Sequence, residues 1–387
     1  MTYYFEEPIY VTRPLLPDLN KLNKRLEHIW ESKWITNSGA VHKELEERLR
    51  QYLEVENLVL FNNGTLALMI GLRALELTGE VITTPFTFPA TVQALDWAGL
   101  TPVFCDIESN TLNIDANKIE SLITDKTSAI LAVHVFGNPC DVERIQQIAD
   151  RYDLKVIYDG AHVFGTYIQN KPIVNFGDMT MLSFHATKLY NTIEGGALIF
   201  RESSLGNKLN LLKNFGITGP EEVVMSGTNA KMNEIQAAFG LEVLELVNEE
   251  RMKRRQIKKT YDKGLSELDG LRTLTILEDK ENSYQYLTIE IKKNKFGVSR
   301  DFLHEALKQH NVFTRKYFYP LCSDFSWYKD LPSARPENLP QAHKATKEVL
   351  SLPFYGDLGS ETASKICEII RDIHYKSILG ELEEGIT

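Results

Sequence analysis

The sequence has no long hydrophobic run and no recognisable export signal. None of its apolar stretches approaches the roughly 18 residues of a membrane span. The first residues carry Glu6 and Glu7, where a secretory signal would have basic residues followed by an apolar core. We therefore expect a protein that is located in the cytoplasm and has no membrane partner.

Cysteine is scarce, and its four residues are widely scattered: Cys105, Cys140, Cys322 and Cys367. No Cys-x-x-Cys pair occurs, which argues against a zinc ribbon or a redox pair and favours buried thiols in a reducing compartment. Three histidines lie within or after strand-like segments, but His134, His162 and His185 do not have the spacing of metal ligands. The sequence therefore predicts no metal site.

Positive charge is also in deficit. Lys and Arg number 43 against 53 for Asp and Glu, which gives a net charge of −10. Binding to nucleic acid needs a positive surface, so no nucleic-acid partner is expected. Several enzyme signatures are missing as well: the dinucleotide-binding glycine motif, the Walker loop, the Gly-x-Ser-x-Gly elbow and His-Glu-x-x-His.

What is present is the composition of an ordinary globular protein, with 43% hydrophobic and 25% charged residues among 387. Apolar, strand-like segments alternate with helical patterns in the first half of the chain. The strand-like segments are 57–61, 80–84, 101–106, 129–136, 155–158, 179–184 and 197–200. The helical segments between them are 65–77, 89–97, 115–123 and 141–151. This alternation predicts an α/β fold with a mostly parallel sheet flanked by helices, which places ligands at the carboxyl ends of the strands.

The pattern changes beyond Asn233. We expect one long helix over 233–265, whose basic run Arg251–Arg255 we interpret as a solvated face in preference to a phosphate patch. A β-like stretch at 284–291 and helices at 300–310 and 360–379 follow. The predicted organisation is an N-terminal arm (1–40), a large domain (41–245) and a smaller C-terminal α+β domain (246–387).

Groups that suit a cofactor lie in the loops after the predicted strands. Gly64 and Thr65 open a helix, where free backbone N–H groups favour a phosphate. Phe88 belongs to an aromatic turn, and Asp159 and Lys188 each follow a strand. Each signal is weak alone, but together they fit pyridoxal 5'-phosphate. Its aldehyde needs a lysine for a Schiff base, its ring nitrogen needs a carboxylate, and its ring needs a flat apolar cover.

These segments resemble the DegT/DnrJ/EryC1/StrS family of sugar aminotransferases. The resemblance covers nearly the whole chain and rests on residues 34–39, 63–68, 85–88, 134–137, 159–162, 183–188, 194–197, 229–234 and 317–321. It implies a fold-type I, aspartate aminotransferase-like enzyme that uses pyridoxal 5'-phosphate, with pyridoxamine 5'-phosphate during turnover, and forms a homodimer with shared active sites. Gly160 and Ala40 depart from the alanine and proline usual in the family, which affects the expected substrate geometry and not the cofactor.

The resemblance implies a role for each matching residue. Lys188 would be the Schiff-base lysine and the general acid and base, Asp159 would pair with the ring nitrogen, and His162 would lie beside the cofactor hydroxyl. Phe88 would stack on the ring. The residues expected to hold the phosphate are Gly64, Thr65, Ser183 and, from the neighbouring subunit, Asn229.

The resemblance further implies two half-reactions, in which L-glutamate donates an amino group and a nucleotide-linked keto-sugar receives it. His162 and the segment 185–188 are closer to the branch that aminates C4. The stretch 315–320 resembles enzymes that form dTDP-4-amino-4,6-dideoxyglucose, a precursor of O-antigen and other lipopolysaccharide glycans. The candidates for sugar-nucleotide binding are Thr36, His185, Lys316, Tyr317 and Tyr319. Packing between domains is an equal alternative for the last three.

Three other functions stay open. A C3-specific aminotransferase acting on a dTDP-3-keto-6-deoxyhexose would be separated only by product analysis. A sugar dehydratase of the same fold would replace the lysine with histidine, so Lys188 argues against it. A regulatory protein that binds the cofactor without catalysis would not need Lys188, Asp159 and the phosphate-holding residues together.

Overall fold

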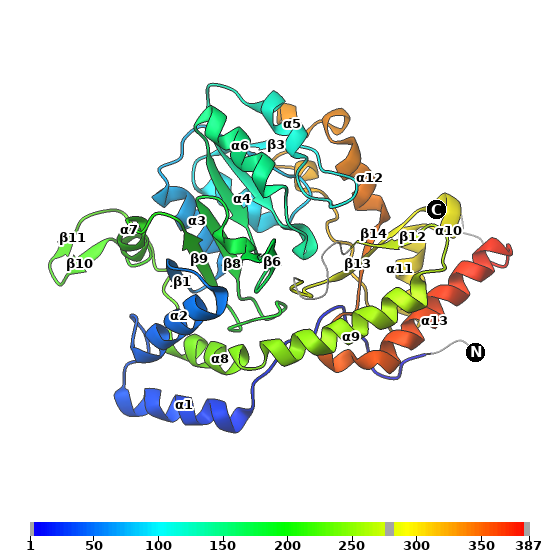
Figure 1. Cartoon of the computed structure of the whole chain (residues 1–387), viewed down its shortest axis with the longest axis horizontal. Coiled ribbons are helices and arrows are strands. Elements are labelled where there is room, and N and C mark those ends of the chain that lie inside the picture. The colour runs from blue at the N-terminus through cyan, green and yellow to red at the C-terminus, as the bar shows by residue number, and fades with distance from the viewer. Residues whose placement is uncertain (1–3, 275–281, 383–387) are drawn as a thin grey trace.

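A seven-stranded sheet forms the centre of the computed structural model, which describes residues 4–274 and 282–382 (Figure 1). The strand order is β1-β9-β8-β5-β4-β2-β3. The strands are β1 (Leu58–Phe61), β2 (Glu80–Thr83), β3 (Thr101–Phe104), β4 (Thr127–Val133), β5 (Lys155–Asp159), β8 (Met179–Ser183) and β9 (Gly196–Phe200). Strands β8, β5, β4, β2 and β3 pair in parallel, whereas β9 pairs antiparallel with β8 and β1. The predicted mostly parallel sheet is therefore confirmed.

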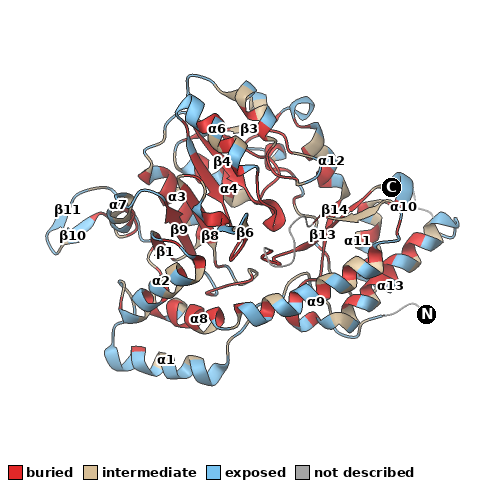
Figure 2. Cartoon of the chain, viewed as in Figure 1, coloured by how far each residue is buried: buried red, intermediate tan, exposed pale blue. Residues whose placement is uncertain are grey.

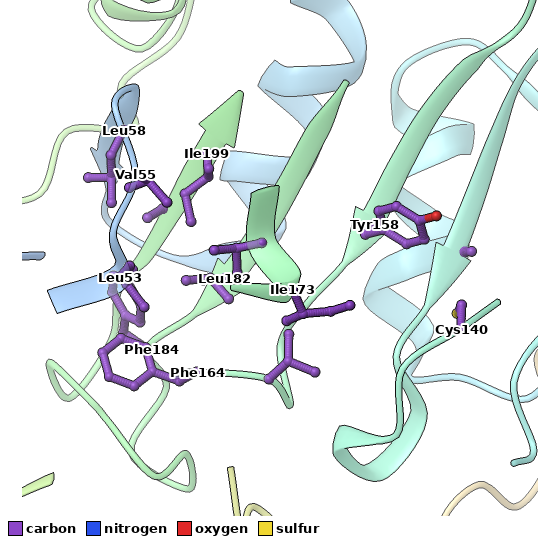
Figure 3. Packing of buried hydrophobic residues seen from close by; sticks show 14 of the residues in the cluster. Leu53, Val55, Leu58, Cys140, Tyr158, Phe164, Ile173, Leu182, Phe184 and Ile199 are labelled. Carbon is purple, nitrogen blue, oxygen red and sulfur yellow. The ribbon is translucent and has the colours of Figure 1, made fainter. Parts of the chain in front are cut away.

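Helices cover both faces of this sheet. One face packs against α2 (Ala40–Leu53), α5 (Ala116–Ile119), α6 (Val142–Tyr152) and α8 (Glu234–Leu244). The other packs against α3 (Gly64–Ala74), α4 (Pro89–Trp97) and α7 (Leu205–Leu212). Successive strand residues alternate between the faces: Leu58 and Leu60 join the first core, Val59 and Phe61 the second. Most strand residues are accordingly buried (Figure 2), and Figure 3 shows Leu182 and Ile199 packed in the first core.

The C-terminal part has its own antiparallel sheet and core. Its strands are β12 (Leu271–Thr273), β13 (Leu287–Ile291) and β14 (Val349–Leu352). Its helices are α9 (Val247–Leu265), α10 (Lys293–Phe296), α11 (Arg300–Gln309), α12 (Pro340–Glu348) and α13 (Gly359–Ile378). The long helices α9 and α13 lie side by side (Figure 1) and bury Ile257 and Ile370 in this core.

Three peripheral elements complete the described chain. Helix α1 (Leu19–Ser32) is mostly exposed (Figure 2), and a short hairpin joins β6 (Tyr167–Ile168) to β7 (Lys171–Pro172). A second hairpin, β10 (Ile217–Gly219) and β11 (Glu222–Val223), projects from the body of the molecule (Figure 1). No helix in the described ranges has the length and apolar character needed to cross a membrane.

A further apolar cluster joins the central and C-terminal parts. Phe86 and Phe104 of the central part pack in one cluster with Phe318 and Leu339 of the C-terminal part, and all four are buried. A buried carboxylate reinforces the junction, because Asp106 accepts hydrogen bonds from the first backbone N–H groups of α12. Loops from both parts therefore reach the same edge of the central sheet.

Three local predictions differ from the structure. The single helix expected over 233–265 is broken at Glu245 and Leu246 between α8 and α9. The strand expected to reach Phe136 ends at Val133, because Phe136 adopts a left-handed conformation (φ 57°) that no strand continues through. The basic run is not a uniformly solvated face, since Arg254 is buried and ion-paired with Glu250.

Candidate active site

A cavity of about 720 Å³ opens at the carboxyl ends of the central strands. Its wall comes from both parts of the molecule, because Tyr286, Arg315 and Phe318 of the C-terminal part face the strand ends. The predicted site residues that line it are Gly64, Thr65, Phe88, Asp159, His162, Ser183, His185, Lys188 and Tyr317. The fold thus brings together residues that lie up to 253 positions apart, from Gly64 to Tyr317.

The N-terminus of α3 forms one end of the cavity. The Asn63 side chain caps the helix by accepting a hydrogen bond from the N–H of Leu66 (2.8 Å). The N–H groups of Gly64 and Thr65 in the first turn have no partner within the helix, as at any helix N-terminus. A Cβ at Gly196 would lie 2.7 Å from the Gly64 backbone, so the close approach of β9 requires glycine there. This end of the cavity has the donors that a phosphate needs.

Asp159 ends β5 and is 5% exposed. Its Oδ2 accepts a hydrogen bond from Thr91 Oγ1 (2.7 Å), and its Oδ1 accepts one from the N–H of Ala161 (3.0 Å). Burial raises the pKa of the carboxyl group, while these two hydrogen bonds and the charge of Lys188 lower it. The carboxylate is therefore fixed in orientation and adjoins a cation.

His162 is buried among aromatic rings. Its Nδ1 accepts a hydrogen bond from the N–H of Phe136 (3.2 Å), so in the neutral ring the proton is on Nε2. Tyr286 meets the ring edge to face, with centroids 5.0 Å apart. Burial lowers the pKa of His162 well below its usual value, which makes the neutral form dominant at pH 7.

Lys188 lies in the turn that follows β8, with its N–H bonded to the carbonyl of His185 (2.8 Å). Its Nζ is 5.7 Å from the centroid of the Tyr286 ring. Burial lowers the pKa of the ammonium group, and the charges of Asp159 and Tyr317 oppose this shift. A larger share of this amine is therefore neutral, and so nucleophilic and basic, than for a lysine in water.

These residues fit pyridoxal phosphate. The α3 N-terminus and Ser183 offer donors for a phosphate, and Asp159 offers a buried, pre-oriented carboxylate for a ring nitrogen. Phe88 is 58% exposed at the cavity wall and offers a flat apolar face.

Four predicted site residues lie outside the cavity lining of the described chain. Thr36 belongs to the loop before α2, which is fixed by a hydrogen bond from the Gly39 N–H to Glu234. Lys316 is ion-paired with Asp301 of α11, and Tyr319 is 61% exposed. Asn229 is exposed, and its backbone pairs with that of Asn214 in an isolated antiparallel β-bridge. Their roles stay predictions.

The structure adds residues to which the sequence assigned no role. Thr91 orients Asp159, and Tyr286, Arg315 and Glu194 line the cavity. Arg315 and Glu194 lie in segments that resemble the family, whereas no local pattern marks Thr91 and Tyr286, which reach the site through the chain topology. Thr180 explains why glycine stands at position 160, where the family usually has alanine. A Cβ at Gly160 would lie 2.8 Å from the methyl group of Thr180.

The sequence is similar to those of known sugar aminotransferases. Over 368 residues the chain is 44% identical to the dTDP-4-amino-4,6-dideoxy-D-glucose transaminase of Escherichia coli, covering 94% of this chain and 98% of that protein. The corresponding enzyme of Shigella dysenteriae is 41% identical over 368 residues, which cover 95% of this chain and 100% of that protein.

Solved structures lead to the same family. The structure of DesI with its TDP-sugar product matches with a TM-score of 0.91 at 34% identity, covering 98% of this chain and 96% of that chain. A Streptococcus pneumoniae protein in its PLP form matches with a TM-score of 0.86 at 26% identity, covering 95% of this chain and 100% of that chain. Residues 18–371 match the DegT/DnrJ/EryC1/StrS aminotransferase family, and the chain belongs to this family of pyridoxal phosphate-dependent sugar aminotransferases.

Proposed function

We propose that the protein transfers the amino group of L-glutamate to C4 of dTDP-4-keto-6-deoxy-D-glucose and forms dTDP-4-amino-4,6-dideoxyglucose. The observation that carries this proposal is the convergence of Lys188, Asp159 and the α3 N-terminus on one cavity. The choice of sugar is supported by the 44% identity to the E. coli enzyme across 94% of the chain.

Each polar group in the cavity has one task in this proposal. Pyridoxal phosphate, when bound, supplies an electron sink for the bond that is broken at the substrate carbon. Lys188 anchors the cofactor and uses its Nζ to take the proton from the α-carbon of glutamate and to return a proton in the second half-reaction. Asp159 keeps the ring nitrogen protonated, and Thr91 keeps Asp159 ionised and in place.

The remaining residues position the reactants. Gly64, Thr65 and Ser183 hold the phosphate, Phe88 covers the ring, and neutral His162 donates from Nε2 toward the cofactor hydroxyl. His185 and Tyr317 line the space left for the substrates.

Arg315 is the natural candidate for an anionic group of the substrates. Its guanidinium lies 5.6 Å from the centroid of the Tyr317 ring and lines the cavity. It has no ion pair with a carboxylate of the described chain. Both substrates carry anionic groups, a carboxylate on glutamate and a diphosphate on the sugar nucleotide, and guanidinium binds either.

The proposal includes a homodimer with two shared sites in the cytoplasm. Asn229 is exposed and outside the cavity of its own chain, as a residue that reaches the partner's phosphate would be. The exposed apolar side chains of the projecting β10–β11 hairpin, Ile217 and Val223, suit burial in such an interface. The product would serve O-antigen or related glycan synthesis.

Product analysis tests the choice of sugar and of carbon. The purified protein is incubated with pyridoxal phosphate, L-glutamate and dTDP-4-keto-6-deoxy-D-glucose, and the product is examined by NMR. We expect an amine at C4 and stoichiometric 2-oxoglutarate. No reaction with this sugar, together with amination of a 3-keto isomer at C3, would overturn the C4 assignment.

A further inference from the structure

A segment of the C-terminal part reaches across to the loop that carries Lys188. Gln285 lies just before β13 and is 2% exposed. Its Oε1 accepts a hydrogen bond from the N–H of Leu189 (2.7 Å), and its Nε2 donates one to the carbonyl of Thr187 (3.0 Å). One side chain thus binds the backbone immediately before and immediately after Lys188.

The chemistry of this bridge requires a primary amide. The Leu189 N–H can only donate and the Thr187 carbonyl can only accept, which fixes the orientation of the Gln285 amide. A carboxylate of the same length has no donor for Thr187, and an apolar side chain of the same length has neither group. A single substitution of Gln285 therefore alters both hydrogen bonds of the bridge at once.

The segment that carries Gln285 is itself held from two sides. Ser283 Oγ donates to the carbonyl of His162 (2.7 Å), on the cavity side. On the opposite side, Arg254 of α9 donates to the carbonyl of Tyr284 (3.1 Å). Tyr286, the next residue in the chain, contacts both His162 and Lys188. Ser283, Gln285 and Tyr286 of this segment therefore meet His162, Lys188 or the backbone beside Lys188.

We infer that Gln285 is a positioning residue that fixes the backbone on both sides of Lys188 and so aims its amine at the cofactor aldehyde. This inference rests on the role proposed above for Lys188. Without the bridge, the buried Leu189 N–H and the part-buried Thr187 carbonyl lose this partner, and the turn around Lys188 keeps only local bonds, from Lys188 to His185 and between Thr187 and His185 among them. The lysine then samples orientations that do not react, and both cofactor retention and proton transfer weaken.

Two variants test this inference through cofactor binding. Gln285→Met keeps the length of the side chain and removes both hydrogen bonds. Its dissociation constant for pyridoxal phosphate, measured by the visible absorbance of the bound cofactor, should rise at least roughly tenfold, because the loss of even one buried hydrogen bond has about this effect. Gln285→Glu should bind more weakly still at pH 8, because the ionised carboxylate opposes the Thr187 carbonyl.

The pH dependence separates the bridge from a general loss of packing. As the pH falls, the carboxyl group introduced by Gln285→Glu becomes protonated and regains a donor, so the affinity of this variant relative to the natural protein should improve. The ratio for Gln285→Met should stay constant. Lys188, His162, Tyr286 and Arg254 surround the segment in all three proteins, so their own titration cancels in these ratios.

Tyr261→Phe provides the matched control. It also removes one buried hydrogen bond, from the Tyr261 hydroxyl to the Pro353 carbonyl (3.0 Å), but in the C-terminal core. It should lower the thermal midpoint and leave the cofactor affinity unchanged. An unchanged affinity in Gln285→Met, or an equal loss in Tyr261→Phe, would overturn the inference. Should Gln285→Met fail to fold, the acid recovery of Gln285→Glu decides, and a flat ratio contradicts the bridge.

Failure of the underlying function would look different. If the natural protein itself showed no visible absorbance with pyridoxal phosphate, the role of Lys188 would fail and the Gln285 inference with it. If the natural protein bound the cofactor normally and both Gln285 variants bound it equally well, the role of Lys188 would stand and the inference about Gln285 alone would be wrong.

Discussion

Burial moves the pKa values of Asp159 and Lys188 in opposite directions, up for the acid and down for the amine. Both shifts favour the neutral forms, because a charge in a dry cavity has lost its hydration. The hydrogen bonds from Thr91 and the N–H of Ala161 work against this for Asp159. Ionisation of the carboxylate is thus favoured in part by a neighbouring hydroxyl group that does not line the cavity.

Removal of the Thr91 hydroxyl group should weaken catalysis. In Thr91→Val the pKa of Asp159 should rise further, and kcat should fall roughly tenfold, the effect of one hydrogen bond to a charged group. Steady-state kinetics measures the change. Thr288→Val, which loses a buried contact to Ser351 in the C-terminal sheet, is the matched control. An unchanged kcat in Thr91→Val would contradict the role of Thr91.

The sequence indicated the lysine and the carboxylate that we propose bear the chemistry, but not the side chains that bind them or the adjacent backbone. Lys188 and Asp159 could be found because each follows a strand, and parallel strands end at one edge. Thr91 binds Asp159 from 68 positions away, and Gln285 binds Leu189 from 96 positions away. Such pairs depend on how the elements are placed in space, which local patterns do not encode.

At the scale of elements, the end of the cavity that we propose binds the phosphate depends on contact between a strand and a helix N-terminus. Gly196 begins β9 and faces the backbone of Gly64, the first residue of α3. Any side chain at position 196 would meet main-chain atoms, which cannot move without shifting the helix. The position of the phosphate donors is therefore set by the smallest residue in the contact.

Gly196→Ala should damage both stability and cofactor binding. The added Cβ would lie 2.7 Å from Gly64 atoms, and overpacking of this kind costs about 1–3 kcal/mol. Urea unfolding measures the stability, and absorbance measures the retained cofactor. Gly206→Ala in α7 is the control, because its Cβ would come no closer than 3.5 Å to the neighbouring Phe200 ring. Equal stability of the two variants would show that β9 and α3 are not tightly packed there.

Element types were predictable in the alternating half of the chain and less so beyond it. Helix α4 has the predicted bounds, Pro89–Trp97, because proline and a hydrophobic repeat mark its start and course. The antiparallel direction of β9 and the break after Leu244 were not predicted. Strand direction and helix breaks depend on tertiary packing, and apolar periodicity is the same in either case.

At the scale of the whole molecule, buried histidines make stability depend on pH. Burial lowers the pKa of His134 to about 3 and of His42 to about 4, and lowers that of His162 as well. The unfolded chain binds protons at these residues below about pH 6.5, while the folded chain does not. Stability is therefore complete above this pH and is lost as the pH falls through the acid range.

Between about pH 7 and pH 5 the free energy of unfolding should fall by about 2 kcal/mol for each such histidine. Asp159, whose pKa is raised, contributes a change of opposite sign. Urea unfolding at several pH values measures the slope of the free energy of unfolding against pH. His42→Gln should reduce this slope by the contribution of one titrating histidine. A stability that is independent of pH in this range would contradict the neutral state of these rings.

The proposed shared dimer can be tested by mixing an inactive variant with an impaired one. Lys188→Ala should abolish turnover without unfolding the protein, and Asn229→Ala should weaken phosphate binding in the partner's site. A hybrid dimer then contains one site with both defects and one with neither, so mixing after partial denaturation should restore activity. Lys155→Ala, at the opposite end of β5, should stay active as a control. If no mixture of Lys188→Ala with Asn229→Ala regains activity, each site is complete within one chain.

The most direct test of the whole account is a spectrum of the purified protein with pyridoxal phosphate, before and after addition of L-glutamate. We expect a yellow protein whose visible band is lost on adding glutamate, as 2-oxoglutarate is released. The band should be absent or altered in Lys188→Ala. A protein that stays colourless with added pyridoxal phosphate would contradict the account, and a band that glutamate leaves unchanged would contradict the proposed amino donor.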